Sequence, residues 1–175
     1  MACNEKIIAM LKQHPEGGEK FFNALDLMIR SDKNIIESFC LLIKEFLSSG
    51  RSTSTCAVLS GHFGRYMLNT CSNFLKNNFN EILLVNGGIR TGNKVELDYL
   101  PKSKNLVFID DSIYSGNTRD QIIKALNKTV RSGEKNYIFT DTFVVYDGMK
   151  IRQLSTHAMF RYYDQENIKK FINIL

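Results

Sequence analysis

The sequence predicts an α/β fold in which a parallel, Rossmann-like sheet is covered by helices on both faces and carries an N-terminal helical cap. Two observations lead to this prediction. From residue 56 onward, short apolar runs of strand length alternate with helical stretches, and that alternation is typical of parallel sheets. Before residue 51, apolar residues recur at three- and four-residue spacings. We therefore divide the 175 residues into a helical cap at 1–50 and an α/β core at 51–175.

Three helices are expected in the cap, because its apolar side chains repeat with helical spacing. Asp32 can cap the third helix, and Gly50 can end it. The apolar positions are Ile7, Ile8, Met10 and Leu11, then Phe21, Phe22, Leu25, Met28 and Ile29, then Ile35, Ile36, Phe39, Ile43, Phe46 and Leu47.

The core is expected to begin after a short polar connection, with compact apolar runs as strands and the stretches between them as helices or turns. The glycine-rich segment 86–104 reads as a polar excursion and residues 147–148 as a turn. In order, the expected strands are 56–59, 81–85, 105–109, 137–146 and 156–163, and the expected helices are 65–76, 119–130 and 166–175.

Composition favours a soluble cytoplasmic protein with an anionic partner. No apolar run reaches the ~18 residues that a membrane span needs, and the first residues lack the pattern of a signal peptide. The four cysteines are widely spaced and form no Cys-x-x-Cys pair, which argues against a zinc site or a disulfide framework. The net charge of +5 suits an anionic partner such as nucleic acid, a membrane surface or a phosphorylated metabolite, but by itself it selects none of them and also fits a solvated basic surface. The basic residues are scattered, which argues against a nucleic-acid site.

One segment combines an apolar strand, two acids and a small polar turn. The run 106–109 leads into Asp110 and Asp111, and the next expected helix starts close behind. Ligands of open parallel sheets bind beyond the carboxyl ends of the strands. There, two carboxylates can accept hydrogen bonds from a vicinal diol, while a turn of small residues at a helix start can hold a phosphate. The pattern predicts a site for a ribose 5-phosphate. Its turn residues are Ser112, Ile113, Tyr114, Ser115, Gly116, Asn117 and Thr118.

This segment resembles the loop of type I phosphoribosyltransferases that binds 5-phosphoribosyl-1-pyrophosphate (PRPP). In that family two acids and three variable residues precede Thr/Ser-Gly-x-Thr, and residues 110–118 match this order without a gap. Ser115, Asn117 and the bulky Tyr114 depart mildly from the usual pattern. The resemblance covers residues 56–146 and implies a PRPP-dependent pentosyltransferase. Asp110 and Asp111 would hold the ribose and bias a Mg²⁺ ion, and the residues through Thr118 would hold the 5-phosphate.

The resemblance also implies a pyrophosphate loop after an earlier strand and a mobile catalytic loop before the PRPP strand. Ser60, Gly61 and His62 occupy the first position, although the family's basic residue and paired glycines are missing there. Residues 89–104 occupy the second, with Arg90 and Lys94 as catalytic candidates and Lys102 and Lys104 as further basic residues. A competing alignment takes residues 86–92 as the pyrophosphate loop, but it leaves too little chain before Asp110.

The implied reaction transfers the 5-phosphoribosyl group from PRPP to a base or another nitrogen acceptor and releases pyrophosphate, with Mg²⁺ as cofactor. The outlying segments would form the hood that selects the acceptor, with the aromatic cluster 160–163 as a candidate stacking face. A homodimer stays open. One rival is a protein of the same fold that binds PRPP or a nucleotide as a sensor without turnover. Another is an aspartate-nucleophile phosphohydrolase, which lacks its second acid because Ser112 stands there.

Overall fold

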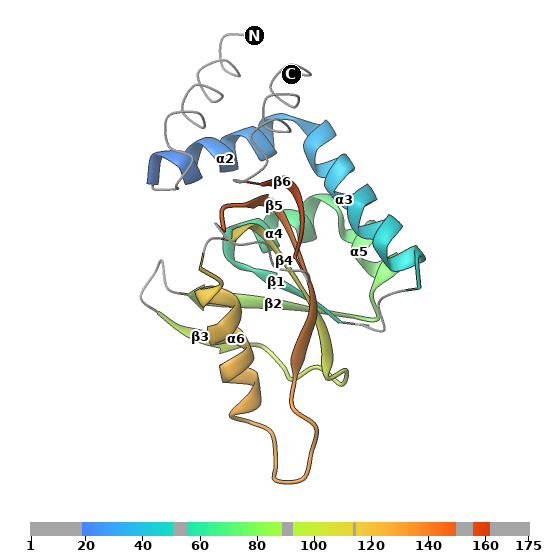
Figure 1. The fold of residues 1–175 in the computed structure, drawn as a ribbon, viewed down its shortest axis with the longest axis vertical. Helices are drawn as coiled ribbons and strands as arrows, with labels where there is room; N and C mark the ends of the chain where they lie inside the picture. The colour runs from blue at the N-terminus through green and yellow to red at the C-terminus, as the bar shows by residue number, and fades with distance from the viewer. Residues whose placement is uncertain (1–18, 51–55, 89–92, 114, 150–155, 162–175) are drawn as a thin grey trace.

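The computed structural model describes residues 19–50, 56–88, 93–113, 115–149 and 156–161, and these residues form a single six-stranded sheet with helices on both faces (Figure 1). The strand order is β3-β2-β1-β4-β5-β6. Every neighbouring pair is parallel except β2 and β3, which run antiparallel. The strands are β1 (Cys56–Ser60), β2 (Glu81–Gly88), β3 (Asn93–Leu97), β4 (Asn105–Ile113), β5 (Ile138–Asp147) and β6 (Thr156–Arg161).

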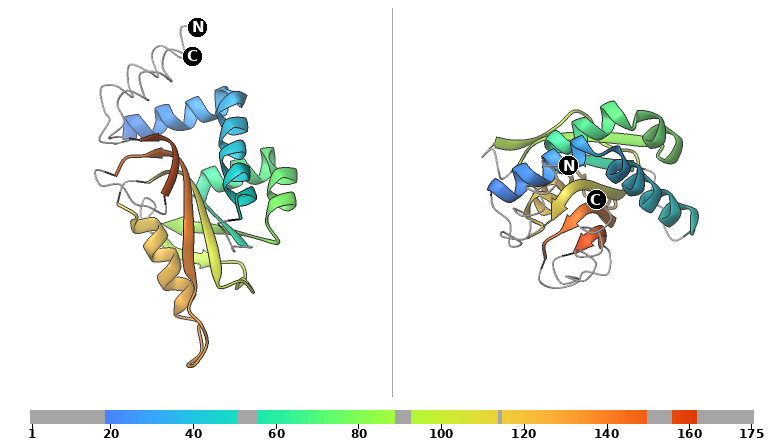
Figure 2. Two further views of the ribbon diagram at one scale, coloured as in Figure 1. Left: turned by 45° about the vertical axis from the view of Figure 1, so that its right-hand side comes forward. Right: turned by 90° about the horizontal axis from the view of Figure 1, so that it is seen from above.

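Two apolar clusters cover the two faces of the sheet. On one face, side chains of β1, β4 and β5 pack against α2, α3, α4 and α5. On the other face, α6 covers β1, β2 and β4 (Figure 2). The expected layering, with helices on both faces of a parallel sheet, is confirmed. The helices are α2 (Glu19–Ser31), α3 (Lys33–Ser48), α4 (Gly61–Thr70), α5 (Ser72–Asn78) and α6 (Asn117–Asn127).

The central strand β1 is buried throughout, which explains why its first four residues are all apolar. Ala57 and Leu59 belong to the cluster under the cap, and Cys56 and Val58 belong to the cluster under α6. Successive side chains of a strand point to opposite faces, so a strand buried on both sides needs apolar residues on both faces.

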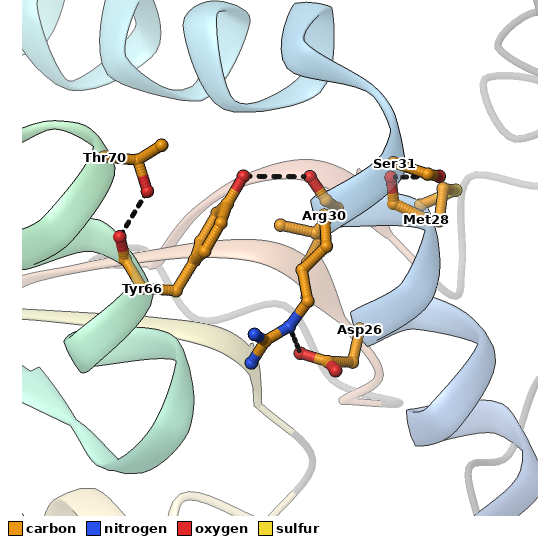
Figure 3. Close-up of polar contacts among 7 residues, drawn as sticks. Asp26, Met28, Arg30, Ser31, Tyr66 and Thr70 are labelled. Carbon is orange, nitrogen blue, oxygen red and sulfur yellow. Dashed lines mark hydrogen bonds and ion pairs between the residues drawn. The ribbon is translucent and has the colours of Figure 1, made fainter.

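The N-terminal helices form the expected cap. Asp32 begins α3 as its N-cap, since its Oδ1 accepts the N–H of Asn34 at 2.9 Å. Figures 1 and 2 show α2 lying across the end of the sheet at which β5 ends. Tyr66 of α4 donates a long hydrogen bond of 3.5 Å to the carbonyl of Ile29 (Figure 3). The guanidinium carbon of Arg30 lies 5.3 Å from the centre of the Tyr66 ring. These contacts and the shared apolar cluster hold α2 over α4.

Several boundaries differ from the expected ones. The helix expected at 65–76 begins at Gly61 and divides at Cys71 into α4 and α5. The excursion expected at 86–104 contains the end of β2 and all of β3. The strand expected to end at Ile109 continues through Ile113, because the backbone of β4 goes on pairing with β5. The helices predicted at 7–11 and 166–175 and the last two residues of the strand predicted at 156–163 lie outside the described residues. Among the described residues, no helix has the length and hydropathy to span a membrane.

Candidate functional site

The end of β1 lies beside the acidic segment of β4, a few residues before β4 itself ends. These strands are parallel neighbours whose last register pair is Leu59 with Ile109. The next residues along the two strands are Ser60 and Asp110, the first residues of the two segments predicted to hold PRPP. The fold therefore places the two predicted binding segments at the same edge, as parallel pairing requires.

The two acids lie within β4 and not in a turn after it. Both are half-buried. Asp110 accepts the N–H of Asp111 through Oδ1 at 2.9 Å, and Asp111 accepts the hydroxyl of Ser112 through Oδ1 at 2.9 Å. Consecutive strand residues project to opposite faces, so the two carboxylates are not equivalent toward a ligand at this edge. Each carboxylate is oriented by at least one local hydrogen bond.

The predicted phosphate turn is shorter than expected, because Ser112 and Ile113 still belong to β4. Ile113 is buried, and its carbonyl accepts the N–H of Gly148 at 2.8 Å. These two residues are therefore strand residues with buried side chains. The described part of the turn consists of Ser115 and Gly116, and Tyr114 lies outside the described residues.

Gly116 turns the chain into α6. Its φ of 72° lies in the left-handed region that favours glycine, and it is the N-cap of the helix. The helix then starts at Asn117, and its first intrahelical bond runs from the N–H of Asp120 to the carbonyl of Gly116 at 2.9 Å. The leading N–H groups of α6, including those of Asn117 and Thr118, have no partner within the helix. They give this end of the helix a positive partial charge that suits a phosphate.

On the β1 side, the chain passes from strand to helix with no intervening loop. Ser60 is buried at the end of β1, and Gly61, with φ 55°, already begins α4. His62 is exposed in the first turn of that helix. The predicted pyrophosphate segment thus consists of a strand end and the N-terminus of α4, which is a second place where helical N–H groups point toward this edge.

Arg65 links α4 to the end of β2. Its Nη2 donates to Oδ1 of Asn86 at 2.8 Å. Asn86 is the first residue of the segment that the sequence assigned to an excursion. Arg90 lies outside the described residues, as does the side chain of Lys94, whose backbone belongs to β3. The catalytic assignment of Arg90 and Lys94 therefore stays a prediction.

Asp147 is a buried acid near this edge that the sequence does not single out. It ends β5 in register with Ile113 of β4 on one side and Arg161 of β6 on the other. It is 1 % exposed, and burial raises the pKa of its carboxyl group, against the opposing effects of the Met149 N–H and the charge of Arg161. In the sequence, Asp147-Gly148 looks like an ordinary turn. The burial of the Asp147 side chain becomes visible only when β4 and β6 are placed on either side of β5.

A dedicated metal cage is not apparent in the described part of the chain, where no three His, Cys, Asp or Glu side chains form a cluster. A Mg²⁺ ion that arrives with a phosphorylated ligand needs only one or two protein carboxylates, since phosphate and water supply its other oxygen ligands. Asp110 and Asp111 fit that limited role by their chemistry and position.

Comparison with known proteins identifies the fold. No protein-family model matches the sequence, and no curated protein matches it. Among solved structures, orotate phosphoribosyltransferase from Aeropyrum pernix is similar with a TM-score of 0.55 at 13% identity, over 82% of this chain and 79% of that chain. Adenine phosphoribosyltransferase from Leishmania donovani is similar with a TM-score of 0.52 at 9% identity, over 81% of this chain and 71% of that chain. The chain has the phosphoribosyltransferase-type α/β fold.

Proposed function

We propose that the protein binds PRPP at the edge formed by the end of β1 and the acidic segment of β4. One observation carries this proposal: Ser60 and Asp110 follow directly on paired residues of adjacent parallel strands. The turn at Gly116 and the start of α6 continue from the same strand. The motif match and the position in the fold, which are separate kinds of support, thus agree on one place.

Each part of the edge has its own role in this proposal. Asp110 and Asp111 accept hydrogen bonds from the ribose hydroxyls. The N–H groups and hydroxyls of residues 115–118 hold the 5-phosphate. The pyrophosphate, with its Mg²⁺, lies toward Ser60, Gly61, His62 and the N-terminus of α4. Arg90 and Lys94 belong to the segment that would close over it.

The reaction proposed for this site is transfer of the phosphoribosyl group to a nitrogen acceptor. The acceptor nitrogen forms a bond to C1 of the ribose, and the bond from C1 to pyrophosphate breaks with its electron pair leaving on oxygen. Positive charge develops on the ribose ring, as in glycoside cleavage. The protein's contribution is to position the two substrates, stabilise charge and exclude water.

A PRPP-binding protein without turnover is the alternative function. The direct passage from β1 into α4 supports it, because it leaves the pyrophosphate a strand end and a helix start in place of a loop with a basic residue. Binding of PRPP is common to both functions. Only the transferase would release pyrophosphate, so a measurement of pyrophosphate release distinguishes the two functions.

The test is thermal unfolding of the full chain with and without PRPP and Mg²⁺. A ligand that binds only the folded state raises its melting temperature. We expect a rise in the wild type, a strongly reduced rise in Asp110→Asn and Asp111→Asn, and an unchanged rise in Asp26→Asn, whose carboxylate is partly exposed on α2. No rise in the wild type at saturating PRPP contradicts the proposal. Pyrophosphate release across a panel of bases then distinguishes a transferase from a sensor.

A further inference from the structure

The carboxylate of Asp147 has one oxygen that no described group satisfies. Oδ1 accepts the backbone N–H of Met149 at 3.0 Å, whereas Oδ2 is buried and has no hydrogen-bond partner among the described residues. Buried polar atoms are nearly always paired, because an unpaired one has lost its hydration without replacement. A buried carboxylate oxygen in this state is therefore a strong acceptor that lacks a donor.

The neighbouring cation does not account for this oxygen. Arg161 lies opposite Asp147 on β6, and its charge lowers the pKa of Asp147. However, its Nη2 donates to the carbonyl of Thr156 at 2.7 Å, and burial outweighs its effect on Asp147. No donor for Oδ2 is therefore found in the described part of the chain.

Position connects this oxygen with the proposed PRPP site. Asp147 lies in register with Ile113 of the adjacent strand, and Ile113 is three residues after Asp110. The N–H of Gly148 donates to the carbonyl of Ile113 and continues this pairing. The same end of the sheet lies beneath α2 of the cap (Figure 1). Asp147 is thus at the carboxyl end of the strand that borders the ribose-binding strand.

We propose that Oδ2 of Asp147 accepts an N–H of the acceptor substrate, and that the acceptor is a nitrogen heterocycle with such a donor and without a negative charge. This inference rests on the proposed function and adds the class of acceptor. A base with an amino group or a ring N–H supplies the missing donor. A base that carries a carboxylate near this position is repelled by the like charge.

The test measures binding of adenine, hypoxanthine and orotate to the full chain by calorimetry in the presence of Mg²⁺ and ribose 5-phosphate, which has no pyrophosphate to release and therefore allows no turnover. We expect wild-type protein to bind adenine or hypoxanthine at least about tenfold more tightly than orotate, since a hydrogen bond to a charged group is gained in one case and lost in the other. Asp147→Asn should weaken binding of the preferred base about tenfold or more and relax the discrimination against orotate. Asp26→Asn should change neither.

The outcomes separate this inference from the proposed function. If PRPP raises the melting temperature of the wild type but orotate binds as tightly as the purines, the inference fails and PRPP binding stands. The same holds if no base binds, or if Asp147→Asn binds the preferred base as the wild type does. If PRPP gives no rise, both proposals fail. The wild-type comparison of bases decides the matter even if Asp147→Asn does not fold.

Discussion

Gly64 of α4 lies so close to Leu59 of β1 that a Cβ atom on the glycine would be 2.9 Å from the backbone carbon of Leu59. The side chains of Leu59 and Leu84 would be equally near. A helix can approach a strand this closely only where no side chain separates them. This contact therefore sets the position of α4, and with it the helix N-terminus that follows Ser60.

Replacing Gly64 with alanine should destabilise the protein, because the backbone of Leu59 cannot yield as a flexible side chain would. We expect a loss of about 1–3 kcal/mol in the free energy of unfolding, measured by chemical denaturation. Asn69→Ala, at an exposed position of the same helix, is the matched control and should change stability by less than about 0.5 kcal/mol. Equal stability of Gly64→Ala and wild type would mean that α4 does not pack as described.

A left-handed glycine at the phosphate turn gives a second prediction. Gly116→Ala should lose about 1–2 kcal/mol of stability, since alanine is strained at a φ of 72° although the space around the site is open. It should also weaken the PRPP-dependent rise in melting temperature, because the strain would displace the turn that leads into α6. Both quantities come from the same thermal and chemical unfolding experiments.

Gly133 supplies the control for this second prediction. It too has a positive φ, of 90°, and open space around it, but it lies in the connection between α6 and β5. Gly133→Ala should therefore lose comparable stability and keep the full response to PRPP. A normal PRPP response in Gly116→Ala would show that the turn does not hold the phosphate.

Thiol reactivity provides a third prediction. The interaction between the two neighbouring thiols lowers the pKa of Cys71 and, together with burial, raises the pKa of Cys40. Burial raises the pKa of Cys56 to about 12. The thiolate is the reactive form, so iodoacetamide should modify Cys71 several-fold faster than Cys40 and Cys56, as followed by peptide mass spectrometry.

Two substitutions at Cys40 test the cause of this order. Cys40→Ala removes the donor and should slow modification of Cys71 several-fold. Cys40→Ser keeps a donor of similar position and should slow it less. Faster modification of Cys40 than of Cys71 in the wild type would contradict the predicted order of thiol pKa values.

The sequence predicts the layers of this fold well, because burial determines both the order of the layers and the apolar pattern of the sequence. A strand covered on both faces, such as β1, is apolar along nearly its whole length, here from Cys56 to Leu59, and that pattern is visible without coordinates. The end of β4 was not predictable in the same way. Its last residues are held by backbone pairing with β5, which is independent of whether Asp110 or Ser112 is polar.

The candidate site was predictable where it lies on one continuous segment. Asp110 and Asp111 stand in a recognisable order before the turn, so the motif locates them. Asp147 was not predictable, because its burial depends on Ile113 and Arg161 from two other strands. Local sequence does not distinguish an exposed turn aspartate from a buried one, and the strand order is needed to tell them apart.

The pH dependence of stability gives the last prediction and tests the state of Asp147 directly. Its pKa is raised by burial above the ordinary value of 3.8. Below that value the group is protonated in both folded and unfolded chains and causes no penalty. As the pH rises through the raised pKa, the folded protein has to bury a charge that the unfolded chain exposes to water, so this group's contribution to stability is lost.

Asparagine at position 147 does not titrate, so Asp147→Asn should be relatively more stable at neutral pH than at acid pH. We expect the difference in unfolding free energy, variant minus wild type, to grow from about pH 4 upward and to reach the order of 1 kcal/mol, the usual cost of a buried polar group without a partner. Denaturation series of the variant and the wild type between pH 3 and pH 8 measure this difference. A difference that instead falls with rising pH would mean that Arg161 stabilises the ionised carboxylate, leaving Oδ2 with no need of a ligand donor.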